Sequence, residues 1–541
     1  MTTKPESQLK PESRVRPESA TVPATPPSAP TGRHAARRRG RASAGAGGGA
    51  GSGEQLPDLR RPTGITGRLK TFLRARWLGT IPGRIRAYAA LALLAVALLL
   101  AVLSVAIGNA RDGVQTIGHD AGPRVVATGS LYFALSDMDA QVANILLIGR
   151  QHDLGIGHDE ALRRYEVRRV EAGQAAVQAA QLAGDNVNMQ RTVREVLDGL
   201  GQYERLVGEA MLLDRQANHA AGQLPQQVVD TYRRATDLMK MELLPKAYNL
   251  TLDSGATVRQ SYESKRTAIE SGRTWVAVTG ALLLAALIVV QVYLAGRFRR
   301  LVNPALALAT VVAFALVAVG VGLLSAQADH LRKAKEDGFD SILALSRARA
   351  ISHSAFADES RYLLDPGRAD TYEQTYLDKS LAVLFVDPMG KPVNLETYYT
   401  RLPQVLRTFD PARDRDAFLG FFGDETDRVR PGPQTAALND TLRAYQKVIE
   451  NDQKMRRLAT GDDRNGAISL RMGRQSGAIK DFDDYDKALD RLSETHRTAF
   501  DQAIKDGDGG LAGWNVIPAG AAVVIAGLIF AGVRPRLAEF R

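Results

Sequence analysis

Two His-Asp pairs are the first residues in this chain whose types and spacing could hold a metal ion. They occur in "RQHDLGIGHDE" as His152–Asp153 and His158–Asp159. Zinc takes three or four ligands from a protein, and the sequence offers no third ligand beside these pairs. The intervening glycines are typical of a turn. We therefore interpret the stretch as a polar turn between helices, and we expect neither a metal nor a cofactor.

Other stretches that imitate catalytic or binding motifs fail on spacing. "GDDRNGAIS" resembles a calcium loop, but Gly461 stands at its first ligand position and Met472 at its twelfth. The tract "GAGGGAGSG" lacks the Lys-Ser/Thr that completes a phosphate loop. The chain has no cysteine, which excludes disulfides and thiolate sites. No protease, hydrolase or kinase signature occurs, so we predict a protein that is not an enzyme.

The net charge of +11 is concentrated at the start of the chain. Residues 1–87 hold 17 Lys and Arg against 5 Asp and Glu, whereas the two large polar blocks are slightly acidic. The basic tract "RRRGRAS" has no aromatic platform for nucleic-acid bases. We predict that it is attracted to anionic membrane lipids, and we expect no nucleic-acid partner.

Four uncharged apolar runs are long enough to cross a bilayer as helices. They are residues 88–108, 275–295, 305–326 and 514–533. Arginines precede the first run and follow the second and fourth, which predicts cytosolic faces there by the positive-inside rule. We therefore predict a multi-pass plasma-membrane protein with both termini in the cytosol and two large extracytoplasmic blocks.

The remaining segments follow from these spans. They are a disordered basic leader at 1–87, a first block at 109–274, a cytosolic turn at 296–304, a second block at 327–513 and a cytosolic tail at 534–541. The turn carries three basic residues, Arg297, Arg299 and Arg300. The plan of span, block and span occurs twice, which indicates an internal repeat of architecture.

Apolar residues in both blocks recur at the spacing of one helix face, for example from Val193 to Met211 and from Leu438 to Leu458. The fold class that we predict is an all-α integral membrane protein with four transmembrane helices. Its blocks are expected to be two antiparallel helical bundles that resemble tandem chemoreceptor input domains. Within the second block, we interpret "DFDDYDKALD" as a solvated helix face, because its acids point to several sides.

One segment of the second block carries a more specific resemblance. "DESRYLLDPGRADTYEQTYLDKS" (Asp358–Ser380) resembles the corresponding segment of the actinobacterial four-span membrane proteins of the GlnX family, and the duplicated topology fits that family from about residue 88 onward. The resemblance implies amino-acid sensing. A glutamine-binding-type solute-binding lipoprotein would bind aspartate or glutamate outside the cell, dock on this protein and alter a cytosolic Ser/Thr kinase, protein kinase G.

Within that segment, charged and aromatic side chains are the candidates for ligand contact or partner docking. They are Arg361, Tyr362, Asp365, Tyr372, Glu373, Tyr376 and Lys379. The alternative is that the tyrosines pack between helices and that the charges are solvated.

The function expected from these observations is a non-enzymatic transmembrane sensor or adaptor. A structural envelope scaffold and an accessory subunit of an amino-acid transporter remain as alternatives. Transport is weakly supported because the spans contain no charged residue. Membrane lipids are expected partners, and a homo-oligomer is compatible with the sequence.

Overall fold

The structure, a computed structural model, describes the chain except for residues 1–80, 152–153, 299–302, 387–389, 411–412 and 539–541. Most of the predicted leader lies outside the described residues, as do the side chains of Arg297, Arg299 and Arg300 in the predicted turn. All described residues belong to one unit, residues 69–541.

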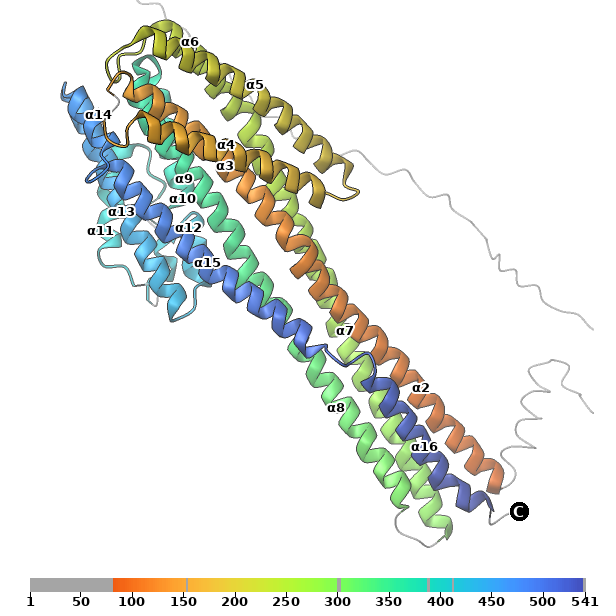
Figure 1. Cartoon of the computed structure of the whole chain (residues 1–541). Helices are drawn as coiled ribbons and strands as arrows, with labels where there is room; N and C mark the ends of the chain where they lie inside the picture. The colour runs from red at the N-terminus through yellow and green to blue at the C-terminus, as the bar shows by residue number, and fades with distance from the viewer. Residues whose placement is uncertain (1–80, 152–153, 299–302, 387–389, 411–412, 539–541) are drawn as a thin grey trace, which may run out of the picture. The chain divides into compact units, whose positions relative to one another are not determined.

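Within the described residues, four helices are long and apolar enough to cross a membrane, which indicates a multi-pass membrane protein by length and composition. The four spans lie in four helices, in chain order α2 (Ile81–Val114), α7 (Leu244–Phe298), α8 (Pro304–Arg332) and α16 (Ile517–Ala538). These four helices pack against one another around a single apolar cluster (Figure 1). Asn303 caps α8 by accepting a hydrogen bond from the Ala305 amide, and it donates one to the Gly532 carbonyl of α16.

Three of the four spans continue into the polar blocks without a break. α2 runs through the π-helix η1 (Gln115–Ala121) into α3 (Gly122–Ile148), and α8 runs through η3 (Lys333–Phe339) into α9 (Asp340–Leu364). On the return, α6 (Gln226–Leu238) and η2 (Met239–Leu243) lead into α7. A short turn separates α15 (Ala478–Gly510) from α16.

The π-helices η1 and η3 occupy equivalent positions in the two halves of the chain. η1 and η3 each contain 7 residues, and each follows the first span of its half. A π-helix inserts one extra residue per turn and is uncommon, so its recurrence at the same place supports a duplication. The repeat of architecture that the sequence indicates is thus visible in the backbone.

The first block is built mainly from helical hairpins. α3 packs along α4 (His158–Leu182), and α5 (Val187–Ala217) packs along α6. The predicted helix face on α5 is correct, since Val193, Val196, Tyr203 and Val207 are all buried. Asn186 caps α5 by accepting a hydrogen bond from the Met189 amide.

The second block combines long helices with a less regular segment. Its helix α13 (Pro433–Thr460) packs along α15 and buries the predicted face from Leu438 as far as Met455, whereas Leu458 at the end of that face is only partly buried. Between α9 and α13 lie η4 (Pro366–Arg368), α10 (Ala369–Val383), β1 (Phe385–Val386), α11 (Leu395–Leu406), η5 (Arg415–Ala417), β2 (Phe418–Leu419) and α12 (Phe421–Arg428). α14 (Arg464–Met472) precedes α15. The antiparallel pair β1–β2 is the only sheet among the described residues, so the predicted all-α class is confirmed.

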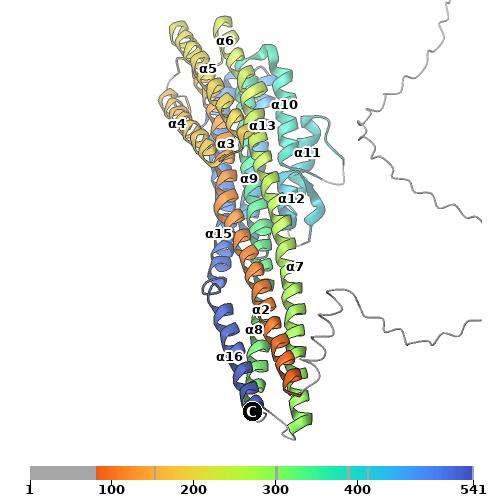
Figure 2. The ribbon, with the colours of Figure 1, turned by 90° about the vertical axis from the view of Figure 1, so that its right-hand side faces the viewer.

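The two blocks share one hydrophobic core, which the sequence did not indicate. A single cluster of buried residues runs from Ala127 in α3 to Leu492 in α15, and it includes members of both blocks. The contact is made chiefly by α3 of the first block against α9 of the second (Figure 2). Because α3 and α9 each continue from a span, the junction between the blocks is directly connected to the membrane helices.

Candidate functional site

The seven candidate residues lie on α9, on α10 and, in the case of Asp365, directly after the end of α9, and most of them are buried. Arg361 has no exposed side-chain surface, and Asp365, Tyr372 and Tyr376 are almost as deeply buried. The structure distributes the seven among three groups of polar contacts. Each group joins segments that are distant in the sequence.

Arg361 and Lys379 meet at the buried carboxylate of Asp358. Arg361 Nη1 lies 2.6 Å from Asp358 Oδ1, Lys240 Nζ of η2 lies 2.8 Å from the same oxygen, and Lys379 pairs with the other oxygen. Burial alone would raise the pKa of Asp358, but the surrounding cations hold it well below its usual range. Burial lowers the pKa of Lys379 to about 7, against the opposing effect of Asp358. This centre fixes α10 and η2 onto α9.

Arg361 also joins the two blocks. Its guanidinium forms an ion pair with Asp139 of α3, and its Nε donates to the Tyr232 hydroxyl of α6 at 3.0 Å. Tyr203 of α5 donates a hydrogen bond to the same Asp139 at 3.0 Å. An arginine on the second block therefore satisfies a buried carboxylate on the first.

Asp365 and Tyr372 form the second group. Arg233 of α6 donates two hydrogen bonds to Asp365, at 2.9 Å and 2.7 Å, and the Tyr372 hydroxyl donates to the same carboxylate at 3.2 Å. This group is again a contact between blocks, because α6 belongs to the first and Asp365 to the second.

The third group surrounds Arg456 of α13. Its guanidinium lies over the rings of Tyr362 and Tyr376, at 4.5 Å and 5.0 Å from the ring centroids. Its Nη1 is 3.6 Å from Glu373, which is the most exposed carboxylate of the candidate set. The tyrosines therefore pack between helices, as the alternative interpretation expected, whereas most of the charges are buried and paired.

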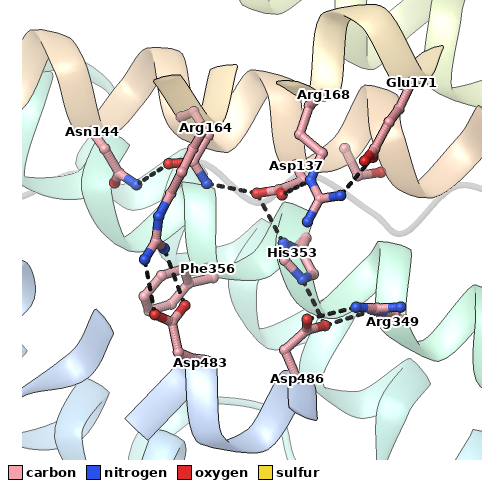
Figure 3. A network of polar contacts seen from close by, with 12 residues as sticks. Asp137, Asn144, Arg164, Arg168, Glu171, Arg349, His353, Phe356, Asp483 and Asp486 are labelled. Atoms are coloured by element: carbon pink, nitrogen blue, oxygen red, sulfur yellow. Dashed lines mark hydrogen bonds and ion pairs between the residues drawn. The ribbon is translucent and has the colours of Figure 1, made fainter. Parts of the chain in front are cut away.

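A second polar centre was not singled out from the sequence. It is a cavity of about 410 Å³ at the junction of the blocks, between α3 and α4 on one side and α9 and α15 on the other (Figure 3). We call it the junction pocket. Its lining consists of Asp137, Gln141, Asn144, Glu160, Arg163, Arg164, Val167, Arg168, His353, Phe356, Ile479, Phe482, Asp483, Asp486 and Lys487.

A buried histidine bridges two carboxylates at the inner wall of the junction pocket. His353 Nδ1 lies 3.1 Å from Asp137 Oδ1, and its Nε2 lies 3.0 Å from Asp486 Oδ1 (Figure 3). Burial would lower the pKa of His353, but the two carboxylates raise it to about 9. His353 is therefore a cation at neutral pH. Its charge holds α3, α9 and α15 together.

Two arginine pairs complete the network. Arg164 of α4 reaches across to Asp483 of α15 with two hydrogen bonds of 3.1 Å (Figure 3). Arg168 of α4 donates to Asp137 at 2.5 Å and to Glu171 at 2.6 Å. Such arginine–carboxylate contacts are directional. Arg164–Asp483 therefore fixes the spacing of the two blocks, whereas Arg168 fixes α4 onto α3 within the first block.

The junction pocket corrects one interpretation from the sequence. The stretch "DFDDYDKALD" is not simply a solvated face, because Asp486 is mostly buried against His353 and Arg349, and Phe482 is part of the core. In the first block, the sequence does contain a sign that Asp137 has buried partners. "SDMDAQVAN" places two acids and two amides in an otherwise apolar helix, which is costly unless partners satisfy them.

The structure describes only the second of the two His-Asp pairs that we interpret as part of a polar turn. His152 and Asp153 fall outside the described residues, whereas His158 and Asp159 begin α4 and are 3.7 Å apart. Within the described part of the chain, no group of three or more His, Cys, Asp or Glu side chains is arranged to hold a metal ion.

The first block matches a known family model. Residues 113–263 match the family model of the actinobacterial sensor domain, a range that extends from the end of α2 through most of the first block and into α7. No curated protein and no solved structure matches the chain. The first block is thus similar to actinobacterial sensor domains, and this similarity supports a sensor role.

Proposed function

We propose that this protein is a non-enzymatic transmembrane sensor that passes the state of its two polar blocks to the cytosol. The blocks lie outside the cell in this proposal, and both termini lie inside. A solute-binding lipoprotein reports aspartate or glutamate availability to the blocks, and a cytosolic Ser/Thr kinase reads the result.

One observation carries the proposal. α3 and α9, which form the contact between the blocks, are continuous with the spans α2 and α8. A small sliding or rotation of one block against the other therefore has to move the spans as well. The match of the first block to a sensor domain supports the same conclusion.

A ligand or partner can drive such a change only if it favours one of two arrangements. The junction between the blocks is suited to this because its contacts are charged and directional. Arg164–Asp483 and His353–Asp137 each connect one block to the other. A partner that docks on both blocks would alter the balance between these contacts.

The first test is recovery of the full chain from actinobacterial membranes with and without glutamate or aspartate. We expect a solute-binding lipoprotein to co-purify in an amount that depends on the ligand. If no lipoprotein is recovered even after crosslinking, the proposal is wrong. Amino-acid uptake in a deletion strain separates the accessory-transporter function, which predicts reduced uptake.

The second test concerns direction and output. A reporter fused after Gly296 should be active only in a cytosolic format, and reporters inserted after Gly184 or Gly432 only in an extracytoplasmic format. Deletion of the gene should make phosphorylation of the kinase's substrates insensitive to external glutamate. Unchanged sensitivity would leave the chain as a scaffold without a signalling role.

A further inference from the structure

The junction pocket has the size of a small-molecule site. Its volume of about 410 Å³ lies within the range of about 300–1,000 Å³ that is typical of ligand pockets. It is formed by helices from both blocks, so a molecule bound there contacts both. The relay described under the proposed function does not by itself explain why the junction contains such a cavity.

The acids of the junction pocket are already engaged. Both oxygens of Asp137 and of Asp486 accept hydrogen bonds or pair with His353. Both oxygens of Asp483 accept from Arg164. Those of Glu160 accept from Arg163 and Arg164. The pocket therefore offers few acceptors to a ligand.

The cations of the junction pocket keep unused donors. Arg163 binds Glu160 through Nε and Nη2, and Arg168 uses Nε and Nη1, so a third nitrogen of each has no hydrogen bond among the described residues. Lys487 of α15 likewise has no partner within the described part of the chain, and it is exposed. The surplus of donors favours an anionic ligand.

One wall of the junction pocket is apolar. The rings of Phe356 and Phe482 stack with centroids 3.9 Å apart and 7° between their planes, and Ile479 and Val167 extend this surface. A carbon chain gains free energy by covering such a wall, whereas a hydrated inorganic anion does not. The ligand should therefore combine acidic groups with a short apolar segment.

We propose that the junction pocket directly binds a small organic carboxylate, of the class of acidic amino acids and short dicarboxylic acids. Arg163 and Arg168 on α4 and Lys487 on α15 donate to the carboxylates, and the phenylalanine wall covers the carbon chain. The inference deepens the proposed function and rests on it for its biological role, since ligand contact with both α4 and α15 would shift the balance between the blocks.

The test is isothermal titration calorimetry on the full chain in lipid nanodiscs, without lipoprotein or kinase. The probes are L-glutamate, L-aspartate and succinate, with L-glutamine and inorganic phosphate as comparators. We expect the three dicarboxylates to bind more tightly than either comparator. Absence of binding by all three, or equal binding of phosphate, would overturn the inference.

The variants Arg163→Gln and Lys487→Gln each remove one exposed cation, so folding should be preserved. Each should weaken dicarboxylate binding by about tenfold, as expected for the loss of one charge-assisted hydrogen bond. The matched controls are Arg169→Gln on α4 and Lys480→Gln on α15, whose side chains pair with Glu166 and Asp484 and do not line the pocket. Equal affinities in all four variants would contradict the assignment.

The readouts separate this inference from the proposed function. If calorimetry detects binding but no lipoprotein co-purifies and kinase output is insensitive to glutamate, the junction pocket stands and the relay fails. If the relay responds to glutamate but the purified chain binds no dicarboxylate, the lipoprotein alone senses the ligand and the pocket assignment is wrong.

Discussion

His353 of α9 and Asp137 of α3 form a buried ion pair that joins the two polar blocks, with 3.1 Å between Nδ1 and Oδ1. The histidine also contacts Asp486 of α15, and Arg349 and Arg168 complete the charges that face this group. The carboxylates raise the pKa of His353 from 6.5 to about 9. The strength of the junction should therefore depend on pH.

The first prediction concerns His353→Gln. The pKa of His353 is about 9 in the folded chain and 6.5 in the unfolded chain. Protonated His353 therefore stabilises the fold fully below pH 6.5, and this stabilisation is lost as the pH rises through 9. The shift corresponds to about 3 kcal/mol. The difference in unfolding temperature between wild type and His353→Gln should thus be large below pH 6.5 and small above pH 9.

The comparison with the variant is needed because Lys379 acts in the opposite sense. Its pKa falls to about 7 on folding, so above pH 7 the unfolded chain binds more protons than the folded chain. The contribution of Lys379 to the free energy of unfolding therefore increases as the pH rises. This contribution is common to wild type and variant and cancels in the difference. The difference in unfolding temperature between wild type and His353→Gln is measured by thermal unfolding of the full chain in detergent, from below pH 6.5 to above pH 9. A difference that does not change with pH would refute the prediction.

The second prediction concerns Arg361→Met. The variant leaves Asp139 without its cation in a position with almost no exposed surface, and it removes one partner of Asp358. Loss of one member of a buried ion pair costs about 3–5 kcal/mol. We expect a correspondingly large fall in unfolding temperature, measured by intrinsic fluorescence.

The control for this variant is Arg368→Gln. Arg368 pairs with Asp237 at 3.0 Å, but 39% of its side chain is exposed, so its loss should cost less than about 1 kcal/mol. The double variant Arg361→Met/Asp139→Asn should be more stable than Arg361→Met alone, because the unpaired charge is removed. Equal stabilities of the single and double variants would argue against the ion pair.

The helices and spans could be predicted from the sequence because their signals are local. The face of α5 and the uncharged runs depend on spacing within one segment, so neighbours in the chain determine them. The pairing of Asp137 with His353 could not be predicted in this way, since it depends on packing between residues 216 positions apart (137 and 353). The polar residues around Asp137 require partners in an otherwise apolar helix, but the sequence does not show which residues these are.

The candidate residues illustrate the same limit. Their charges and aromatic rings predicted an interaction site, and Arg361 does interact, but its partners Asp139 and Tyr232 lie within the chain. A sequence does not distinguish a charge that faces a ligand from one that faces another helix of the same protein. Burial decides between them, and burial is a property of the packed structure.

The third prediction is a covalent link between the blocks. A Cβ atom placed on Gly129 of α3 would lie 3.3 Å from Cβ of Ser346 on α9, close to the separation of about 3.5–4.5 Å found in disulfides. Because the chain has no cysteine, the double variant Gly129→Cys/Ser346→Cys has no competing thiol. We expect a disulfide on mild oxidation, detected as fragments that stay joined after proteolysis between the two positions.

This disulfide also tests the relay. It would prevent α3 from sliding along α9, so the oxidised variant should lose the response of kinase output to glutamate and regain it on reduction. Each single cysteine variant should respond normally. A full response from the oxidised protein would mean that the signal does not depend on movement between these two helices.

The fourth prediction concerns the π-helices that join spans to blocks. Of the π-helices, η1 and η3 each have a glycine that packs against α15, whereas η2 has no glycine. A Cβ on Gly118 of η1 would lie 2.7 Å from the side chain of Ile504, and a Cβ on Gly338 of η3 would lie 2.7 Å from Cβ and 3.0 Å from Cα of Phe500. The isoleucine side chain can rotate away, whereas the backbone of Phe500 has to shift. Gly338→Ala should therefore be more destabilising than Gly118→Ala, which should cost about 1–3 kcal/mol.

The control is Gly173→Ala on α4, where a Cβ meets nothing within 4 Å. Alanine favours a helix over glycine by about 0.5–1 kcal/mol, so this variant should raise the unfolding temperature. From most to least stable, the expected order is thus Gly173→Ala, wild type, Gly118→Ala and Gly338→Ala. If Gly338→Ala unfolded at the temperature of wild type, α15 would not pack against η3 as described.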